Sequence, residues 1–247
     1  MEILTQEGYG FLSRWAHFLA GITWIGLLYY FNFVQVPAFA EMTPEGRSEA
    51  MRRVTWRALW WFRWGAMFTV LTGILILAFN EQLTRDYFST VPGTAIAAGG
   101  ILGIIMFSNV WLVIWPAQQI AIGSANTVAD GGEADPAAPA AARRAALASR
   151  TNTLFSIPML LFMGGTSHLF GSTHFVLDLA NDALAAWWVI FAVIVAAIEL
   201  NALGWPFGHA PHWSKAPYDT IRGVLISGFV LTVVFYVVFE ILFQAPA

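Results

Sequence analysis

The chain has 247 residues, of which 58% are hydrophobic and only 11% are charged. Soluble domains carry roughly 25% charged residues, so this composition excludes an ordinary soluble protein. No basic patch with interleaved aromatic side chains is present, which excludes nucleic acid as a partner, and the net charge of −3 adds nothing because the charges lie in loops.

The absence of cysteine limits the metal chemistry. With no cysteine in the sequence, disulfides, iron–sulfur clusters, thiolate zinc sites and covalently attached c-type haem are excluded for these residues. Histidine is therefore the main ligand available. The chain has five: His17, His168, His174, His209 and His212.

Apolar segments of about 20 residues predict the fold, because that length crosses the ~30 Å hydrocarbon core of a bilayer. We expect an all-α polytopic membrane protein, a single transmembrane domain with a bundle of about six transmembrane helices. The predicted spans are about 11–36, 58–79, 94–115, 151–170, 183–203 and 221–243. The N-terminus has no basic residue or small-residue cleavage site, so we expect no cleaved signal peptide. Residues of about 117–150, rich in Ala, Pro, Gly and Asp, predict a flexible loop.

The distribution of Lys and Arg predicts the orientation. Arg14 and Arg85 lie on one side of the predicted spans. The loops after the first, third and fifth spans carry eight basic residues: Arg47, Arg52, Arg53, Arg57, Arg143, Arg144, Arg150 and Lys215. Because basic loops stay in the cytoplasm, we expect both termini to face outward, and a bacterial inner membrane as the location.

His17 and His168 are the candidate cofactor ligands, since an ionisable residue in a membrane span is expected to be functional and paired. Their depths from the outer ends of their spans are ~9 Å and ~3 Å at 1.5 Å per residue. Gly21 and Gly164 lie one turn deeper on the same helix faces and leave gaps for a flat macrocycle. Arg14 is placed to pair with a haem propionate. The hypothesis is b-type haem held by two histidines. One alternative is that the two histidines bind copper. The other is that they bind no metal and are structural hydrogen-bonding groups.

The other histidines are weaker candidates. His174 follows His168 by six residues in a short outer loop, where it is either solvated or an alternative ligand. His209 and His212 form an HxxH pattern in GWPFGHAPHW, whose Gly and Pro residues predict a loop. A loop does not place both imidazoles on one face, so the pattern is weak evidence for a metal site.

A second polar set is expected toward the inner side of the membrane. It comprises Arg63, Asn109, Asn152 and Glu199. Charges at membrane depth tend to pair, so we expect an ion pair between Arg63 and Glu199. The alternative is that these side chains extend from helix ends toward water.

Several segments together resemble a known family. RWAHFLAGITWIG, LWWFRWGAMFTVLTG, SNVWLVIWPAQQ and SRTNTLFSIPMLLFMGGTSH are similar, in order and spacing, to the membrane domain of bacterial cytochrome-c-linked urate oxidase (urate hydroxylase). The resemblance extends through His168 and is weak beyond it. It departs from the family pattern at Gly65, where an acidic residue is expected, and at Thr151, where a histidine is expected.

The resemblance implies site residues and a partner. It places His17 and His168 on family histidines, and it places these residues on other motif positions: Arg63, Asn109, Gln118, Arg150, Asn152 and Pro158. The family joins this domain to a c-type cytochrome that accepts electrons from urate. Because these residues include no cysteine, we expect a separate cytochrome.

Three functions follow from these patterns. The first is a redox protein, with b-type haem on His17 and His168, that exchanges electrons with an outer c-type cytochrome. The second is a non-catalytic accessory subunit of a respiratory or photosynthetic electron-transfer complex, favoured by small-residue segments such as AAGGILG. A transporter ranks last, because no inverted repeat or pair of broken helices is apparent. Whether the chain is an enzyme, and on what substrate, the sequence leaves open.

Overall fold

The computed structural model describes residues 2–171 and 181–244, and in these ranges the long elements are all helices. α1 (Gln6–Tyr29) passes through the π-helical segment η2 (Tyr30–Gln35) into α2 (Val36–Glu41). α3 (Pro44–Ala50) and η3 (Met51–Thr55), also π-helical, lead into α4 (Trp56–Phe79). The remaining elements are α5 (Arg85–Phe88), α6 (Val91–Ser108), the π-helical η4 (Asn109–Ile114), α7 (Trp115–Ala129), α8 (Ala138–His168), α9 (Asn181–Ala202), α10 (Ala216–Asp219) and α11 (Ile221–Phe243).

Five helical stretches of the described residues are long and apolar enough to cross a membrane. They are Gln6–Glu41, Pro44–Phe79, Val91–Ala129, Asp182–Ala202 and Ile221–Phe243. The first has 36 residues, which is ~54 Å at 1.5 Å per residue, so it extends well beyond the ~30 Å hydrocarbon core. The prediction of an all-α integral membrane protein is therefore confirmed.

The fourth predicted span, about 151–170, corresponds mainly to the second half of α8, which does not meet the same criterion of apolarity. Its first turns contain a run of polar side chains, Thr151, Asn152, Thr153 and Ser156. All four are fully buried. α8 is thus the helix that the others surround, and its polar groups are kept away from lipid.

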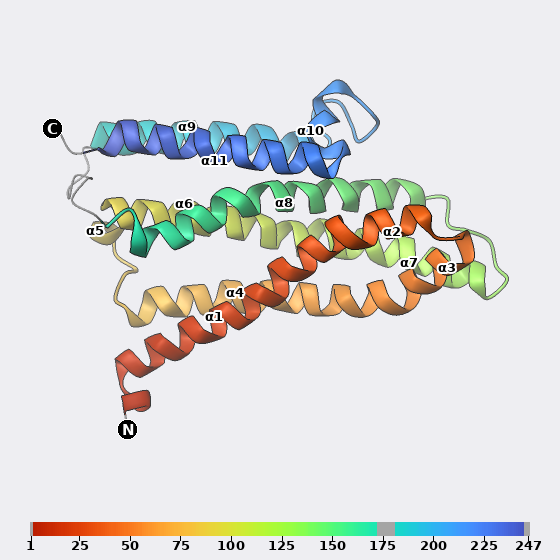
Figure 1. The fold of residues 1–247 in the computed structure, drawn as a ribbon, viewed down its shortest axis with the longest axis horizontal. Helices are drawn as coiled ribbons and strands as arrows, with labels where there is room; N and C mark the ends of the chain where they lie inside the picture. Colours follow the sequence, from red (N-terminus) through yellow and green to blue (C-terminus); the bar gives the residue numbers. More distant parts are fainter. Residues whose placement is uncertain (1, 172–180, 245–247) are drawn as a thin grey trace.

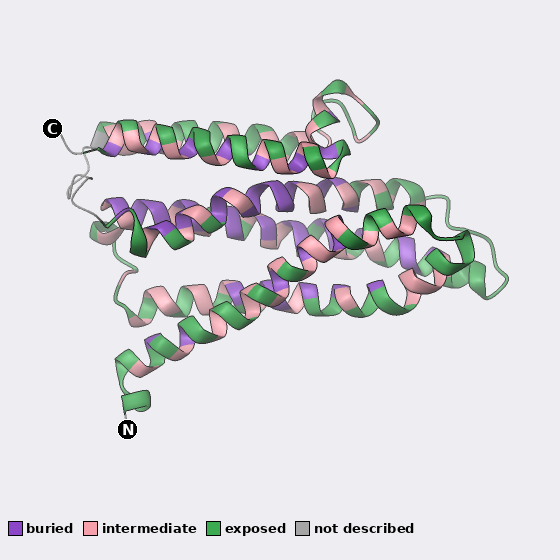
Figure 2. Cartoon of the chain, viewed as in Figure 1, coloured by how far each residue is buried: buried purple, intermediate pink, exposed green. Residues whose placement is uncertain are grey.

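The helices form layers around α8 (Figure 1). α9 and α11 lie side by side along one side, α6 and α8 occupy the middle, and α1 and α4 pair on the other side. Figure 2 shows that burial is concentrated on α6 and α8, whereas the outer faces of α1, α4, α9 and α11 are exposed. The start of α1 and the end of α11 lie at the same end of the bundle, opposite to α3 and α10 (Figure 1).

Hydrogen bonds fasten α1 and η2 to α8. The Ser156 hydroxyl donates to the Thr153 carbonyl at 2.7 Å, so the Tyr29 hydroxyl, 2.8 Å from Ser156 Oγ, is the donor to it. Asn32 Nδ2 donates to Ser149 Oγ at 2.9 Å. Because no water is available in a bilayer core, such groups must find partners within the protein.

Glycines allow the closest helix approaches. A Cβ on Gly228 of α11 would lie 2.5 Å from Ile157 Cδ1 of α8, and one on Gly99 of α6 would lie 2.9 Å from Met163 Cγ. A Cβ on Gly65 of α4 would lie 3.2 Å from the backbone nitrogen of Trp24. The larger acidic side chain expected at position 65 would therefore displace α1.

The prediction of a flexible loop over about 117–150 is wrong for most of that segment. α7 continues to Ala129 and α8 begins at Ala138, which leaves only residues 130–137 between the helices. Alanine has the highest helix propensity, so the alanine-rich stretch favours helix once it packs on the bundle. The break coincides with Gly131, whose φ of 86° is in the left-handed region.

Substitution of Gly99 by alanine tests the contact between α6 and α8. We expect Gly99→Ala to destabilise the protein by about 1–3 kcal/mol, because the added methyl group overpacks a contact that includes backbone. Gly100→Ala is the matched control, since a Cβ there meets nothing within 4 Å. Thermal unfolding in detergent measures both, and equal midpoints would contradict the close approach.

Candidate functional site

A buried hydrogen-bonded cluster joins three helical elements in the middle of the bundle. Asn109 Nδ2 donates to Asn152 Oδ1 at 2.9 Å and to Glu199 Oε2 at 3.1 Å. Asn152 Nδ2 donates in turn to the Met106 carbonyl at 2.9 Å. The prediction that Asn109, Asn152 and Glu199 form one polar set is thus matched by their contacts.

The backbone around Asn109 positions this cluster. Asn109 is the first residue of the π-helical segment η4, where the regular helix of α6 ends. π-helical turns within α-helices are frequent at functional sites because they redirect side chains. Asn109 and Asn152 are buried and Glu199 is half-buried, so the carboxylate has a fixed donor in a region of low polarity.

Arg63, the fourth member of the predicted polar set, lies elsewhere. Its guanidinium carbon lies 3.8 Å from the ring centroid of Trp115 and 4.7 Å from that of Trp111. The described residues contain no ion pair between Arg63 and Glu199, so that expectation is wrong. Two tryptophans one turn apart on neighbouring elements provide a cation–π environment that replaces the carboxylate.

His17 is held by α4. Its Nδ1 lies 2.9 Å from the Thr69 carbonyl oxygen and 3.2 Å from Thr72 Oγ1. A carbonyl oxygen only accepts, so Nδ1 carries the proton and Nε2 presents a lone pair. A Cβ on Gly73 would lie 3.2 Å from His17 Cε1, so the half-buried ring packs against the α4 backbone.

His168, the last residue of α8, is exposed. Tyr29 follows His17 by 12 residues and its partner Ser156 precedes His168 by 12, so both histidines lie ~18 Å from that contact along their helices. The first half of α1, however, diverges from the end of α8 (Figure 1). The described residues contain no hydrogen bond between the two imidazoles.

The structure places the other predicted haem-site residues in different surroundings. The space above Gly21 is bounded by Thr69 Cγ2, 4.0 Å from where a Cβ would stand, so it serves the contact of α1 with α4. Gly164 meets nothing within 4 Å. Arg14 is exposed and forms no ion pair among the described residues. His174 lies outside the described residues.

The segment between α9 and α11 holds a buried charge that sequence reasoning missed. Lys215 is fully buried, and its Nζ donates to the Asn201 carbonyl and, at 2.7 Å, to Asn201 Oδ1. Burial, and secondarily the nearby Arg143, lowers the pKa of the Lys215 ammonium. A lysine next to a Pro-rich loop gives no sequence signal of burial.

His209 and His212 do not form a metal site together. His212 Nδ1 lies 2.9 Å from Ser214 Oγ, and its ring stacks on Phe207 with centroids 4.3 Å apart. His209 packs on Gly204, and burial lowers the pKa of its imidazole, with Arg144 contributing. The described residues contain no group of three or more His, Asp or Glu side chains arranged for a metal ion.

The remaining positions implied by the resemblance are structural in the described contacts. Arg150 Nη1 donates to the Tyr218 carbonyl at 2.7 Å, which ties α8 to α10. Pro158 is buried within α8, and Gln118 is half-buried on α7. Thr151, where a histidine is expected, is fully buried and donates to the Leu147 carbonyl at 2.9 Å.

Comparison with known proteins identifies one family. A family model described as Urate oxidase N-terminal matches residues 78–203, about half of the chain. The matched range contains Asn109, Asn152, Glu199 and His168. It begins beyond His17 and continues past His168, where the resemblance noted from the sequence is weak. No curated protein and no solved structure matched the chain.

Removal of the Asn109 amide tests the polar cluster. We expect Asn109→Ala to destabilise the protein by about 1–2 kcal/mol, above the ~0.6 kcal/mol average for one side-chain hydrogen bond in a membrane protein, because two acceptors lose their donor. Ser108→Ala is the control, since that hydroxyl bonds only to Ile104 of its own helix. Thermal unfolding of both, and of Asn152→Ala with and without Asn109→Ala, gives the coupling; additive effects would contradict a shared cluster.

Proposed function

The chain belongs to the urate oxidase N-terminal family, and from that premise we propose that it is a membrane redox protein. In this proposal it binds b-type haem through His17 and His168 and exchanges electrons with a c-type cytochrome. The cytochrome is a separate polypeptide or segment, because the 247 residues contain no cysteine to attach c-type haem.

The observation that carries the proposal is the hydrogen bond of His17. Metal-ligating histidines nearly always donate the proton of one ring nitrogen to a carbonyl or carboxylate, which fixes the tautomer and leaves the other nitrogen for the metal. His17 Nδ1 has such an acceptor in the Thr69 carbonyl at 2.9 Å. No contact in the described part of the chain occupies His17 Nε2. This hydrogen bond supports His17 Nε2 as the nitrogen that would hold the haem iron.

The residues proposed for the other parts of the site fit less completely. Gly164 leaves open space one turn from His168, and Arg14 has no ion-pair partner in the described residues, so each suits its predicted role. Gly21, in contrast, is used by the contact with Thr69. His168 is exposed at the end of α8, and its role as second ligand rests on the family position and the matching depth.

The haem would supply one-electron chemistry, with a potential set by its axial ligands and by burial. The residues of this chain do the rest. His17, fixed by Thr69 and Thr72, would orient one ligand, and Arg14 would bind a propionate by charge-assisted hydrogen bonds. The apolar faces of α1 and α4 would exclude water from the group.

The orientation defines where the partner would dock. The start of α1 and the end of α8 lie at the same end of the bundle (Figure 1). The opposite end carries the basic loops, and the positive-inside rule assigns those to the cytoplasm. We therefore propose that the cytochrome approaches from the outer side.

A spectroscopic experiment tests this function. The purified protein should show the paired Soret and alpha-band changes of low-spin b-type haem in a reduced-minus-oxidised spectrum. His17→Ala should abolish that spectrum with the protein still folded, because it removes the imidazole that the Thr69 carbonyl orients for the iron. His168→Ala should reduce or shift it, and His212→Ala, in the inner loop, is the matched control that should leave it unchanged.

The opposite results have a defined meaning. A wild-type spectrum without haem, or a His17→Ala spectrum equal to that of the wild type, would refute the proposed site. If the haem-free protein also co-purified in fixed ratio with an electron-transfer complex, the accessory-subunit function would replace the redox function.

A further inference from the structure

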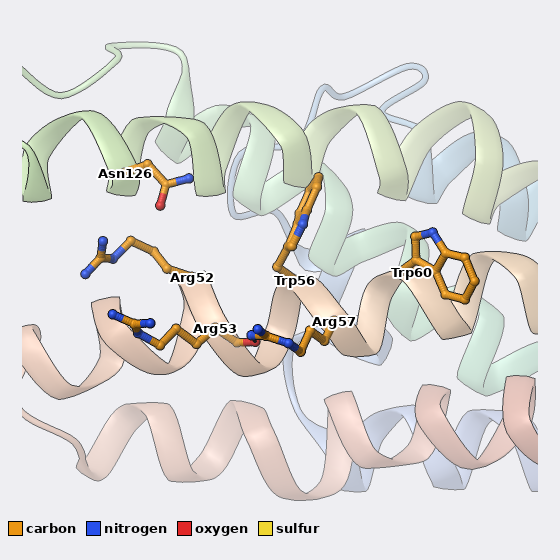
Figure 3. Close-up of a pocket in the computed structure, with 6 residues that line it drawn as sticks. All are labelled: Arg52, Arg53, Trp56, Arg57, Trp60 and Asn126. Carbon is orange, nitrogen blue, oxygen red and sulfur yellow. Dashed lines mark hydrogen bonds between the residues drawn. The ribbon is translucent and has the colours of Figure 1, made fainter.

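A pocket of about 590 Å³ lies at the start of α4, at the end of the bundle that carries the basic loops. Six side chains line it: Arg52, Arg53, Trp56, Arg57, Trp60 and Asn126. In Figure 3 the two guanidinium groups of Arg52 and Arg53 lie side by side, and Trp56 extends from α4 toward the helix that bears Asn126. The pocket combines three cations with two large amphipathic rings.

The pocket has an excess of positive charge. Glu49 is the carboxylate that pairs with these arginines in the described residues: it contacts Arg53 Nε and lies 2.6 Å from Arg52 Nη2. Arg57 Nη1 donates only to the Arg53 carbonyl, at 2.7 Å. One carboxylate thus faces three guanidinium groups. Arg52 Nε is buried without a hydrogen-bond partner in the described part of the chain.

The local backbone and the tryptophans fix this arrangement. Arg52 and Arg53 lie in the π-helical segment η3, and Thr55 of the same segment donates to Gln35 of η2 at 2.9 Å. Trp56 stacks on Trp115 with ring centroids 5.1 Å apart. Tryptophan is enriched at the membrane–water boundary, where its ring contacts the headgroup region. Trp56 and Trp60 therefore suit the depth of lipid headgroups.

An apolar face of α4 leads from the pocket into the membrane-spanning part of the helix. Trp60, Trp64 and Phe68 follow at four-residue spacing, with ring centroids 6.3 and 6.2 Å apart. Leu71 and Leu75 continue the same face and are exposed, as are Trp60 and Phe68. Residues at this spacing share one side of a helix, so the face offers a continuous surface for an extended hydrocarbon chain.

We propose that this pocket binds the headgroup of an anionic phospholipid of the inner leaflet, with its acyl chain along the apolar face of α4. Arg52 and Arg57 would bind the phosphate, and Trp56 and Trp60 would contact the glycerol region. A soluble anion would need only the arginines, whereas the apolar face beneath them distinguishes a lipid. This inference is independent of the haem proposal.

Lipid titration tests it. The detergent-purified protein is titrated with phosphatidylglycerol, phosphatidylcholine or inorganic phosphate, and bound lipid is counted by native mass spectrometry alongside the unfolding midpoint. We expect phosphatidylglycerol to bind preferentially and to raise the midpoint. Arg52→Gln with Arg57→Gln should weaken its binding about tenfold or more, because two charge-assisted contacts are lost while the Arg53–Glu49 pair remains.

The control removes the same charge elsewhere on the same side. Arg47→Gln with Arg144→Gln changes two exposed arginines that form no ion pair among the described residues, and it should leave lipid binding unchanged. Arg57→Gln alone serves if the double variant does not fold, since Arg57 contacts only its own helix. Equal binding of phosphatidylcholine, equal loss in the control, or the same stabilisation by inorganic phosphate would each overturn the proposal; the last would indicate a soluble-anion site.

Discussion

The constraint on which the structure depends is the burial of a polar helix inside a protein that faces lipid. Thr151, Asn152, Thr153 and Ser156 of α8 are fully buried, and a bilayer offers no water to satisfy them. Each therefore bonds within its own helix or to a neighbour, and the neighbours are thereby positioned. Asn152 fixes α6 and η4, and Ser156 fixes α1. The polar groups of α8 determine which helices lie beside it. The apolar groups of α8 require only that this helix be buried.

The same constraint explains where the chemistry-bearing side chains lie. α1 contacts α8 at Tyr29, while its residues from Ala20 to Trp24 pack on α4 across Gly65. This crossing brings His17 to the Thr69 carbonyl. The sequence predicts that His17 pairs with His168 of α8, but it is α4 that orients the His17 ring. Because Nδ1 of His17 carries the proton, only Nε2 has a lone pair with which the imidazole can bind a metal ion.

The sequence predicts much of the fold but less of the neighbour relationships. Apolar length indicates five of the helices directly, and the expectation that polar groups at membrane depth pair correctly unites Asn109 and Glu199. It assigns Arg63 to Glu199, however, because charge alone does not reveal that Trp111 and Trp115 face the guanidinium. Composition likewise suggests a loop over about 117–150, because the Pro, Gly and Asp residues of that stretch are typical of loops, but its alanines have the highest helix propensity and form the end of α7 and the start of α8. The carbonyl that holds His17 has no sequence signal, because every residue carries one.

Family membership and the proposed haem site draw on different parts of the molecule. The family match covers residues 78–203, which include the Asn109–Asn152–Glu199 cluster and His168 but not His17 or the pocket arginines. What the family match covers is therefore the polar centre of the bundle, on which α1 and α4 are packed. His17, a candidate from its position in a membrane span, is supported in the structure by its own hydrogen bond. Tyr29 and Ser156 join α1 to α8, and from that contact His17 and His168 each lie 12 residues along their own helix. The case for a two-histidine site thus depends on the geometry of α1 as much as on the family.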